Sequence, residues 1–269
     1  MTDYKTITLE RQDGVATLTL NRPDSLNALT VEMGRELHEA IEAVKSDHGS
    51  RVLVLTGAGR AFCAGEDVKQ RPADSGETRA RQTPLSKLAS GPEGLMHFAD
   101  TLRSMTKPTV ASINGYAVGQ GLSIALACDI RIASDEAGFG AIWTRLGIPP
   151  ESSGAYLLTH LVGPARACEL IFMGKIIDAA EAEKIGLINQ SVPADQLAEV
   201  TQAMVRQLAD GPPVAIGISK MMVYQALETS LDVHSRLEFF GQDYTFNTKD
   251  REEGIQSFLE KRPPKFTGE

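Results

Sequence analysis

GAGRAFCAGEDV (residues 57–68) and NGYAVGQGLS (residues 114–123) are the two stretches that decide the fold, and both are rich in glycine. Each follows a short run of β-branched and aliphatic residues, which predicts a buried strand that ends in a turn. Glycine lets a backbone approach a ligand closely, and the helix predicted at 119–127 would present unpaired N–H groups at its start. Tight packing of a helix on a sheet uses glycine for the same reason, so each turn alone is compatible with a purely structural role.

The first stretch follows a strand, so a dinucleotide-binding loop must be considered. Its spacing does not fit, because Phe62 stands where the third glycine of that motif belongs. No amphipathic helix follows it directly. Nucleotide binding at this turn is therefore excluded as the main interpretation.

Elements around these turns alternate between strand and helix. An Asp-Gly pair joins two alternating segments within 7–20, which is typical of a β-hairpin. Thr30 is expected to cap a helix whose apolar face is formed by Met33, Leu37, Ile41 and Val44. Buried strands are predicted at 52–55, 109–113 and 130–133. The alternation predicts an α/β fold built from right-handed βαβ units.

After about residue 150 the sequence is expected to be mostly helical. A further helix is expected at 92–105, and residues 70–84 carry proline, glycine, serine and charges, so we expect a mobile surface loop there. The C-terminal helices are predicted at 155–161, 164–173, 179–185, 196–208, 213–227 and 231–243.

Composition restricts the partners. The chain has 269 residues, 42% hydrophobic and 23% charged, with a net charge of −8, which disfavours nucleic acid or an anionic membrane as a partner. Cys63, Cys128 and Cys168 have neither disulfide nor zinc spacing, so no metal is expected. Cys63 and Cys128 are interpreted as core residues, and Asp129 as a residue that caps or bridges rather than reacts. The absence of an unbroken apolar run predicts a cytoplasmic protein.

Taken together, the motifs resemble those of the crotonase superfamily, also called enoyl-CoA hydratase/isomerase. The resemblance rests on AFCAGEDV at 61–68 and INGYAVGQG at 113–121, with NRPDSLNAL at 21–29, CDIRIA at 128–133 and FLEKRP at 258–263. It implies a crotonase-like spiral of repeated ββα units with a helical C-terminal extension. The expected division is a core at 1–200, with the CoA-binding and oxyanion turns, and an extension at 201–269 used in oligomerisation, as a homotrimer or a hexamer.

The resemblance also implies a site for an acyl-CoA thioester. The backbone N–H groups of Glu66 and Gln120 would bind the thioester oxygen, where negative charge develops during reaction. Gln120 replaces a glycine that is usual in the family. No cofactor is expected beyond the CoA moiety of the substrate. The residues implied in CoA binding are Ser25, Leu26, Ala28, Ala64, Asp67 and Val68, together with Phe258 and Lys261 near the C-terminus for the nucleotide end.

The reaction is indicated by acids near the second turn. Two-glutamate hydratases of the family would carry their glutamates at Ser123 and Trp143, and neither residue is a carboxylate here. Glu151 matches the single catalytic glutamate of peroxisome-type Δ3,Δ2-enoyl-CoA isomerases, which the sequence resembles around 146–154. We therefore expect isomerisation with Glu151 as proton shuttle. Trp143 is expected to line the substrate site in an apolar pocket with Phe139 and Leu146.

Other activities stay open. A hydratase could use a water held by Ser123 and Glu151. Trp143 with an acid at Glu151 also resembles 4-chlorobenzoyl-CoA dehalogenase, for which His97 lies near the position of the base. A non-catalytic CoA-binding relative is a further alternative, whereas an RNA-binding relative is disfavoured because the predicted helix at 30–45 carries four glutamates.

Overall fold

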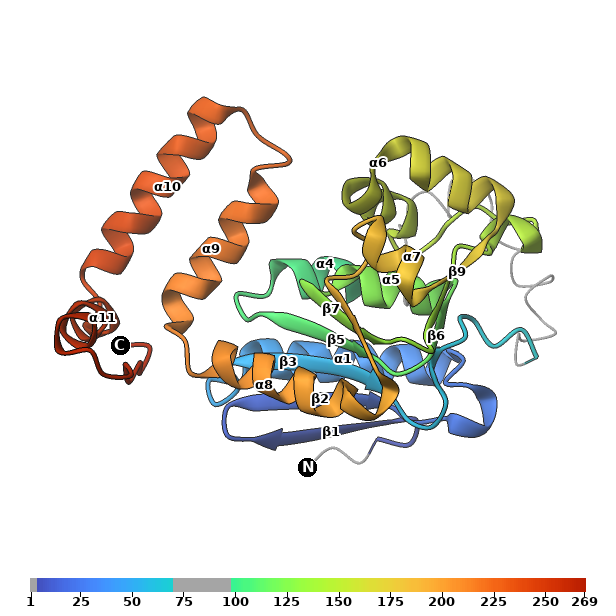
Figure 1. Ribbon diagram of the computed structural model, residues 1–269, viewed down its shortest axis with the longest axis horizontal. Helices are drawn as coiled ribbons and strands as arrows, with labels where there is room; N and C mark the ends of the chain where they lie inside the picture. Colours follow the sequence, from blue (N-terminus) through green and yellow to red (C-terminus); the bar gives the residue numbers. More distant parts are fainter. Residues whose placement is uncertain (1–3, 70–97) are drawn as a thin grey trace, which may run out of the picture.

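A computed structural model of the chain describes residues 4–69 and 98–269 (Figure 1). Its larger sheet has six strands in the order β1-β2-β3-β5-β7-β10, and every neighbouring pair is parallel except β1 and β2. The predicted hairpin is confirmed, with Asp13 and Gly14 at φ 49° and 80° in its turn. The six strands are β1 (Ile7–Gln12), β2 (Val15–Leu20), β3 (Val52–Gly57), β5 (Thr109–Ile113), β7 (Ile130–Ser134) and β10 (Gln190–Val192).

A second sheet has four short strands in the order β4-β6-β8-β9. Three successive strands of the larger sheet, β3, β5 and β7, are each followed by a strand of the smaller one. Helices α5 (Gln120–Ala127) and α6 (Gly154–Met173) then close two of these units, so the predicted spiral of ββα units is confirmed. The short strands are β4 (Ala61–Cys63), β6 (Tyr116–Val118), β8 (Gly138–Gly140) and β9 (Ile176–Asp178).

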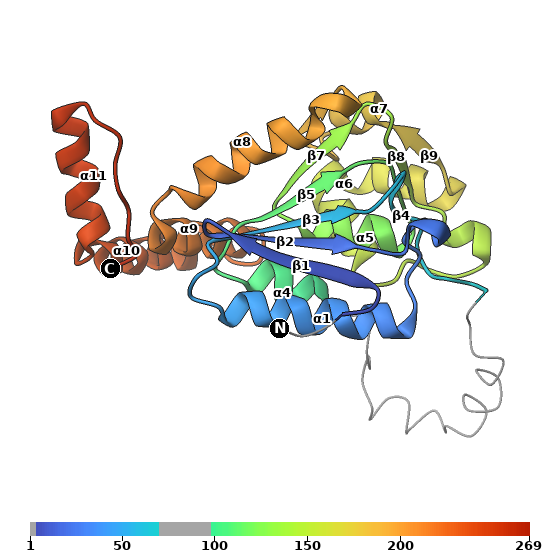
Figure 2. The same ribbon diagram turned by 90° about the horizontal axis from the view of Figure 1, so that it is seen from below.

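One face of the larger sheet is covered by α1 (Val31–Ser46), α4 (Phe98–Ser104) and α5 (Figure 2). Thr30 caps α1 as predicted, because its side chain accepts a hydrogen bond of 3.1 Å from the Met33 N–H. The four apolar residues predicted for this helix are completely buried. Helix α4 corresponds to the C-terminal part of the helix predicted at 92–105. The loop predicted at 70–84, and His97, lie outside the described residues.

The C-terminal part contains the predicted helices and three elements that were not predicted. Helix α6 has a non-helical Gly163, at φ 75° and ψ 164°, so it corresponds to the two predicted helices. Strands β9 and β10 and helix α11 are additional, and the expectation that this region is mostly helical is confirmed. The other helices are α7 (Ala179–Lys184), α8 (Leu197–Ala209), α9 (Pro213–Gln225), α10 (Leu231–Phe246) and α11 (Lys249–Glu260), with short 3-10 turns η1 (Pro23–Ser25), η2 (Trp143–Leu146) and η3 (Ala194–Gln196).

Helix α8 covers the other face of the larger sheet. Its Leu197 and Val205 belong to a buried cluster with Val52, Val110 and Ile132 of the strands. The boundary predicted at residue 200 therefore falls inside a helix that packs on the core. Helices α9, α10 and α11 extend beyond the sheet at one end of the molecule (Figures 1 and 2).

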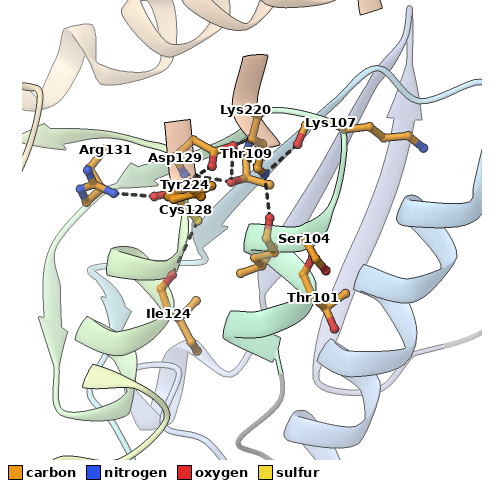
Figure 3. A network of polar contacts seen from close by, with 11 residues as sticks. Thr101, Ser104, Lys107, Thr109, Ile124, Cys128, Asp129, Arg131, Lys220 and Tyr224 are labelled. Atoms are coloured by element: carbon orange, nitrogen blue, oxygen red, sulfur yellow. Dashed lines mark hydrogen bonds and ion pairs between the residues drawn. The ribbon is translucent and has the colours of Figure 1, made fainter. Parts of the chain in front are cut away.

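A buried polar network attaches α9 to the core (Figure 3). The Lys220 ammonium lies 2.8 Å from the Asp129 carboxylate and donates hydrogen bonds to the carbonyl oxygens of Leu102 and Lys107. The Tyr224 hydroxyl donates to the other Asp129 oxygen over 2.6 Å, and the Thr109 N–H donates to the first. Burial lowers the pKa of Lys220 against the attraction of Asp129, and burial also raises the pKa of Tyr224. The interpretation of Asp129 as a bridging residue is confirmed.

Candidate active site

Two amide side chains, one of them buried, hold the first glycine-rich turn. Asn27 is completely buried, and its Nδ2 donates hydrogen bonds of 2.9 and 2.8 Å to the carbonyl oxygens of Ala58 and Ala61. Asn114, from the second turn, donates to the Gly59 carbonyl over 2.8 Å. The loop between β3 and β4 is thus fixed from two sides by residues distant in sequence. Sequence reasoning quoted both asparagines within motifs and gave neither a role.

The two turns lie against each other. Strands β4 and β6 are paired, and a Cβ built on Gly65 would lie 2.8 Å from the Val118 carbonyl oxygen and 3.7 Å from the Gln120 nitrogen. Gly65 has φ 93°, and Gly119 has φ 55° with ψ −122°, which are conformations that favour glycine. A side chain at either position would disturb this approach. The structure therefore brings the segment of Gly65 and Glu66 close to the Gln120 backbone.

Gln120 and Glu66 present their N–H groups differently. Gln120 is the first residue of α5, so its N–H has no intrahelical acceptor and lies at the positive end of the helix dipole. Glu66 forms an isolated parallel bridge with Leu29, in which the Gly65 oxygen and the Asp67 nitrogen bond to Leu29. Since alternate residues of an extended chain bond to opposite sides, the Glu66 N–H is directed away from Leu29. The N–H groups of Glu66 and Gln120 can stabilise an oxyanion together only where both donate hydrogen bonds to the same oxygen atom.

The predicted CoA-binding residues come together around the first turn. The Ala64 N–H donates to the Leu26 carbonyl over 3.0 Å, which places the segment 25–28 beside 64–67. Arg22 forms an ion pair of 2.9 Å with Asp67, and both side chains are largely buried. Sequence reasoning missed Arg22. Because that pair engages the Asp67 carboxylate, Asp67 supports the turn by holding Arg22, whose guanidinium also donates to the Ala28 carbonyl.

Of the other residues predicted for CoA binding, Val68 ends the first turn, whereas Phe258 and Lys261 lie apart from it. Val68 is 59% exposed at the edge of the turn. Phe258, which is 82% exposed, and Lys261 belong to the end of α11, at the opposite end of the chain from β4 and β6 (Figures 1 and 2). Within one chain they do not join the two turns. Any contribution from them requires a neighbouring copy of the chain.

Glu151 is fixed beside the second turn through its main chain. Its carbonyl oxygen accepts hydrogen bonds from the Ser123 hydroxyl at 3.1 Å and from the Gly154 N–H at 2.9 Å. The next residue, Ser152, is bonded through its hydroxyl to the Gln120 side-chain amide over 3.3 Å. Ser152 and Ser153 adopt φ 52° and 61°, which is uncommon for residues with a side chain. The segment that carries Glu151 is thus attached to the first turn of α5 at two points.

Trp143 packs between the same elements. It is 1% exposed, and a Cβ built on Gly154 would lie 2.8 Å from its ring. Its indole nitrogen lies 4.0 Å from the place that a Cβ on Gly119 would occupy. Phe139 is also buried, whereas Leu146 is 56% exposed and does not belong to this buried group. Gly147, at φ 70°, ends the turn η2 there and leaves Leu146 in solvent.

The described residues were also compared with what a cysteine nucleophile, a metal site or a membrane-spanning helix requires. Cys63 and Cys128 are buried as predicted, and burial raises the pKa of each thiol to about 12, so neither is a thiolate nucleophile near neutral pH. Within 4–69 and 98–269, no three His, Cys, Asp or Glu side chains are arranged to hold a metal ion. None of the helices described is both long and apolar enough to cross a bilayer.

Comparison with known proteins identifies the family in which this arrangement occurs. A family model described as enoyl-CoA hydratase/isomerase matches residues 10–269. The chain is 37% identical over 258 residues to the 1,2-epoxyphenylacetyl-CoA isomerase of Escherichia coli (strain K12), with 96% of each chain covered. It is 34% identical to the crotonyl-CoA hydratase of Syntrophomonas wolfei subsp. wolfei (strain DSM 2245B / Goettingen), with 98% of each covered. The crystal structure of an enoyl-CoA hydratase from Bacillus anthracis matches with a TM-score of 0.88 at 32% identity, covering 98% of this chain and all of that one.

The chain therefore belongs to the enoyl-CoA hydratase/isomerase family, which forms the crotonase superfamily. It is an enzyme family, and its members act on CoA thioesters. The relatives include proteins named as isomerases and proteins named as hydratases, so membership alone does not select the reaction.

Proposed function

We propose that this enzyme isomerises an enoyl-CoA thioester, with Glu151 as the acid and base and the N–H groups of Glu66 and Gln120 as the oxyanion hole. The observation that carries the proposal is the double attachment of the Glu151 segment to the first turn of α5, through Ser123 and through Gln120. It holds the only acid of the predicted mechanism next to the turn that would bind the thioester. A fixed base is what a proton transfer at C2 requires.

The chemistry follows from where charge develops. Glu151 would take a proton from C2 of a 3-enoyl thioester, and the electron pair would move onto the thioester oxygen. The two N–H groups would stabilise that oxyanion, typically by about 3 kcal/mol for each donor. The protonated Glu151 would then return its proton at C4, which leaves the double bond between C2 and C3. A single carboxylate is sufficient for both transfers.

The position of Ser123 favours isomerisation over hydration by Ser123 and Glu151. Its hydroxyl group is completely buried and donates to the Glu151 carbonyl oxygen, so that proton is already engaged. Hydration is the second candidate, supported by the printed names of several relatives, including the crotonyl-CoA hydratase. Isomerase chemistry is supported by the name of the relative from Escherichia coli.

The decisive experiment compares Glu151→Gln with the wild type on 3-enoyl-CoA and 2-enoyl-CoA, with product identification by chromatography. We expect the variant to lose isomerisation by at least about a hundredfold while it still binds the thioester, because only the proton carrier is removed. Glu136→Gln, at an exposed glutamate, is the matched control. Full isomerase activity of the Glu151 variant would exclude the proposed role. Hydration of 2-enoyl-CoA without any isomerisation by the wild type would favour the second candidate.

We also propose that the chain assembles as a homotrimer or a dimer of trimers through its C-terminal helices. The aromatic residues Phe239, Phe240 and Tyr244 of α10 are each about two-thirds exposed, so they are not an intrachain core. An exposed apolar patch of this kind is typical of a protein interface. Light scattering after size exclusion is expected to give three or six times the chain mass of 29.0 kDa. Phe240→Asp should lower that mass, and Val31→Asp on α1 should not.

A further inference from the structure

The guanidinium of Arg103, on α4, lies over two tyrosine rings that belong to different helices. Its central carbon is 4.2 Å from the centroid of the Tyr224 ring on α9 and 5.2 Å from that of the Tyr156 ring on α6. Both distances are within the range in which a cation is attracted to the face of an aromatic ring. The three side chains line one cavity of about 520 Å³, together with Ser153. Arg103 therefore connects α6 with α9.

One side of this contact is attached to the core. The Tyr224 hydroxyl donates a hydrogen bond of 2.6 Å to Asp129, whose other carboxylate oxygen lies 2.8 Å from the Lys220 ammonium (Figure 3). Leu102, the residue before Arg103, is completely buried, so α4 is packed on the core at this point. The Tyr224 ring and the Arg103 guanidinium thus both belong to fixed parts of the fold.

The other side of the contact is the first turn of α6. Tyr156 lies in that turn, five residues after Glu151. Between them, Ser152 and Ser153 have φ of 52° and 61°. Backbone conformations of this kind persist only where the surrounding structure holds them. The segment that carries Glu151 therefore needs attachments at both of its ends.

We infer that Arg103 is a positioning residue, which holds the first turn of α6 through Tyr156 and thereby fixes the backbone from which Glu151 projects. This inference rests on the proposed function, since it takes Glu151 to be the acid and base. Ser123 and Gln120 attach the segment to α5, and Arg103 attaches the helix that follows it. Arg103 acts through Tyr156 and supplies no group to the reaction.

The same contact links the acid to the C-terminal helices. Tyr224 belongs to α9, so a displacement of α9 would move one of the two rings that hold Arg103. The placement of α9 on the core is then a condition for a well-positioned Glu151.

The test measures kcat and KM for isomerisation of a 3-enoyl-CoA in variants of both contact residues. Arg103→Met removes the charge, and Tyr156→Leu removes the ring. We expect each to lower kcat by about tenfold and to change KM by about threefold or less, because the acid is misplaced while the thioester is still held. Arg103→Lys retains a cation and Tyr156→Phe retains the ring, so both should keep kcat within about threefold of the wild type.

Arg251→Met is the matched control. It removes a cation that lies 4.4 Å from the centroid of the Phe246 ring, in a contact between α11 and α10. The control loses the same kind of interaction away from the Glu151 segment, so its kcat should be that of the wild type.

Double variants separate positioning from a general structural role. If Arg103 acts through Tyr156, the Arg103→Met/Tyr156→Leu variant should be about as slow as the slower single variant. If both act through Glu151, Arg103→Met should not lower the residual rate of Glu151→Gln any further. A loss that is only structural would instead lower that rate by the same factor as in the wild type.

The outcomes distinguish this inference from the proposed function. Wild-type kcat in Arg103→Met or in Tyr156→Leu, or independent effects in the double variants, would overturn the positioning role and leave the proposed function intact. Full isomerase activity of Glu151→Gln would overturn the proposed function, and the positioning role with it. If circular dichroism shows that Arg103→Met does not fold, Tyr156→Leu and Tyr156→Phe test the same contact, and equal kcat in these two variants would overturn the inference.

Discussion

Ser123 and Glu151 are joined by a hydrogen bond of 3.1 Å from the serine hydroxyl to the glutamate carbonyl oxygen. The resemblance to the family predicts that Ser123 stands where two-glutamate hydratases carry their first glutamate. The Ser123 side chain therefore fixes the backbone of Glu151, the acid of the proposed mechanism, and supplies no acid itself. This relationship links α5, which begins at the oxyanion turn, to the residue that the proposed mechanism uses.

Ser123→Ala is expected to lower kcat by about tenfold or more with a smaller change in KM, because the Glu151 segment loses one of its two attachments to α5. The free energy of unfolding should fall by about 1 kcal/mol, since the Gly154 N–H still bonds to the Glu151 carbonyl. The measurements are steady-state kinetics and urea denaturation.

Ser112→Ala is the matched control for Ser123→Ala. Ser112 is also a buried serine, and its hydroxyl lies 3.0 Å from that of Thr201 between β5 and α8. This variant should lose a similar amount of stability and keep its kcat. A Ser123 variant with wild-type kcat would show that the hydrogen bond does not position Glu151.

Gly65→Ala is expected to abolish most activity, because the added Cβ would lie 2.8 Å from the Val118 carbonyl oxygen and would separate the two turns. The φ of 93° at this position adds backbone strain. Gly147→Ala is the control, since Gly147 has φ 70° but no heavy atom within 4 Å of the new Cβ. Its cost should be limited to the backbone strain, about 1 kcal/mol of stability. Equal losses of activity in the two variants would contradict the proposed oxyanion geometry.

The larger elements of the fold could be predicted because each carries its own periodicity. Helix α1 is an example, with a capping threonine and an apolar face. Strand β9 could not be predicted, because three residues show no alternation and the strand forms only by antiparallel pairing with β8. Helix α11 was missed because it is highly charged and buries only Asp250 and Ser257, so it lacks the apolar stripe on which the prediction depends.

For the site, the sequence indicated the turns but not the side-chain contacts that hold them. Glycines mark the turns locally, since few residues can adopt their backbone angles. The Arg22–Asp67 pair joins residues 45 positions apart, and the bond from Ser123 to Glu151 spans 28 positions. Such contacts depend on how the units of the spiral pack. No local sequence pattern predicts these side-chain contacts.

Lys220→Met is expected to lower the free energy of unfolding by about 3–5 kcal/mol, because it leaves the Asp129 carboxylate without its cation in a buried site. The side chains of Lys220 and Asp129 are only 7% and 16% exposed. The double variant Lys220→Met/Asp129→Asn should recover part of the loss, since the remaining charge is removed. Lys249→Met, which breaks an exposed pair with Glu269, should change stability little. A double variant that is less stable than Lys220→Met would contradict this account.

Alkaline pH is expected to destabilise the fold through Cys63 and Cys128. Burial raises the pKa of each thiol in the folded protein to about 12, against an ordinary value of 9.0. Below pH 9 both the folded and unfolded states hold the proton, so this contribution to stability is fully present. Between pH 9 and about 12 the unfolded state loses the proton first, and the free energy of unfolding falls by about 1.4 kcal/mol for each pH unit and each thiol.

The test of the two thiols is urea denaturation under reducing conditions at about pH 8 and about pH 10.5, a range that crosses the onset of thiolate formation in the unfolded state. Cys63→Ala and Cys128→Ala should each reduce the fall in stability between these two pH values, whatever their stability at the lower one. Comparison of slopes is needed because burial also lowers the pKa of Lys220 and raises the pKa of Tyr224, and both residues are unchanged in the variants. Cys168→Ala, at an exposed cysteine, should keep the wild-type slope. If neither Cys63→Ala nor Cys128→Ala flattens the pH dependence, the thiols are not protonated in the folded state as burial requires.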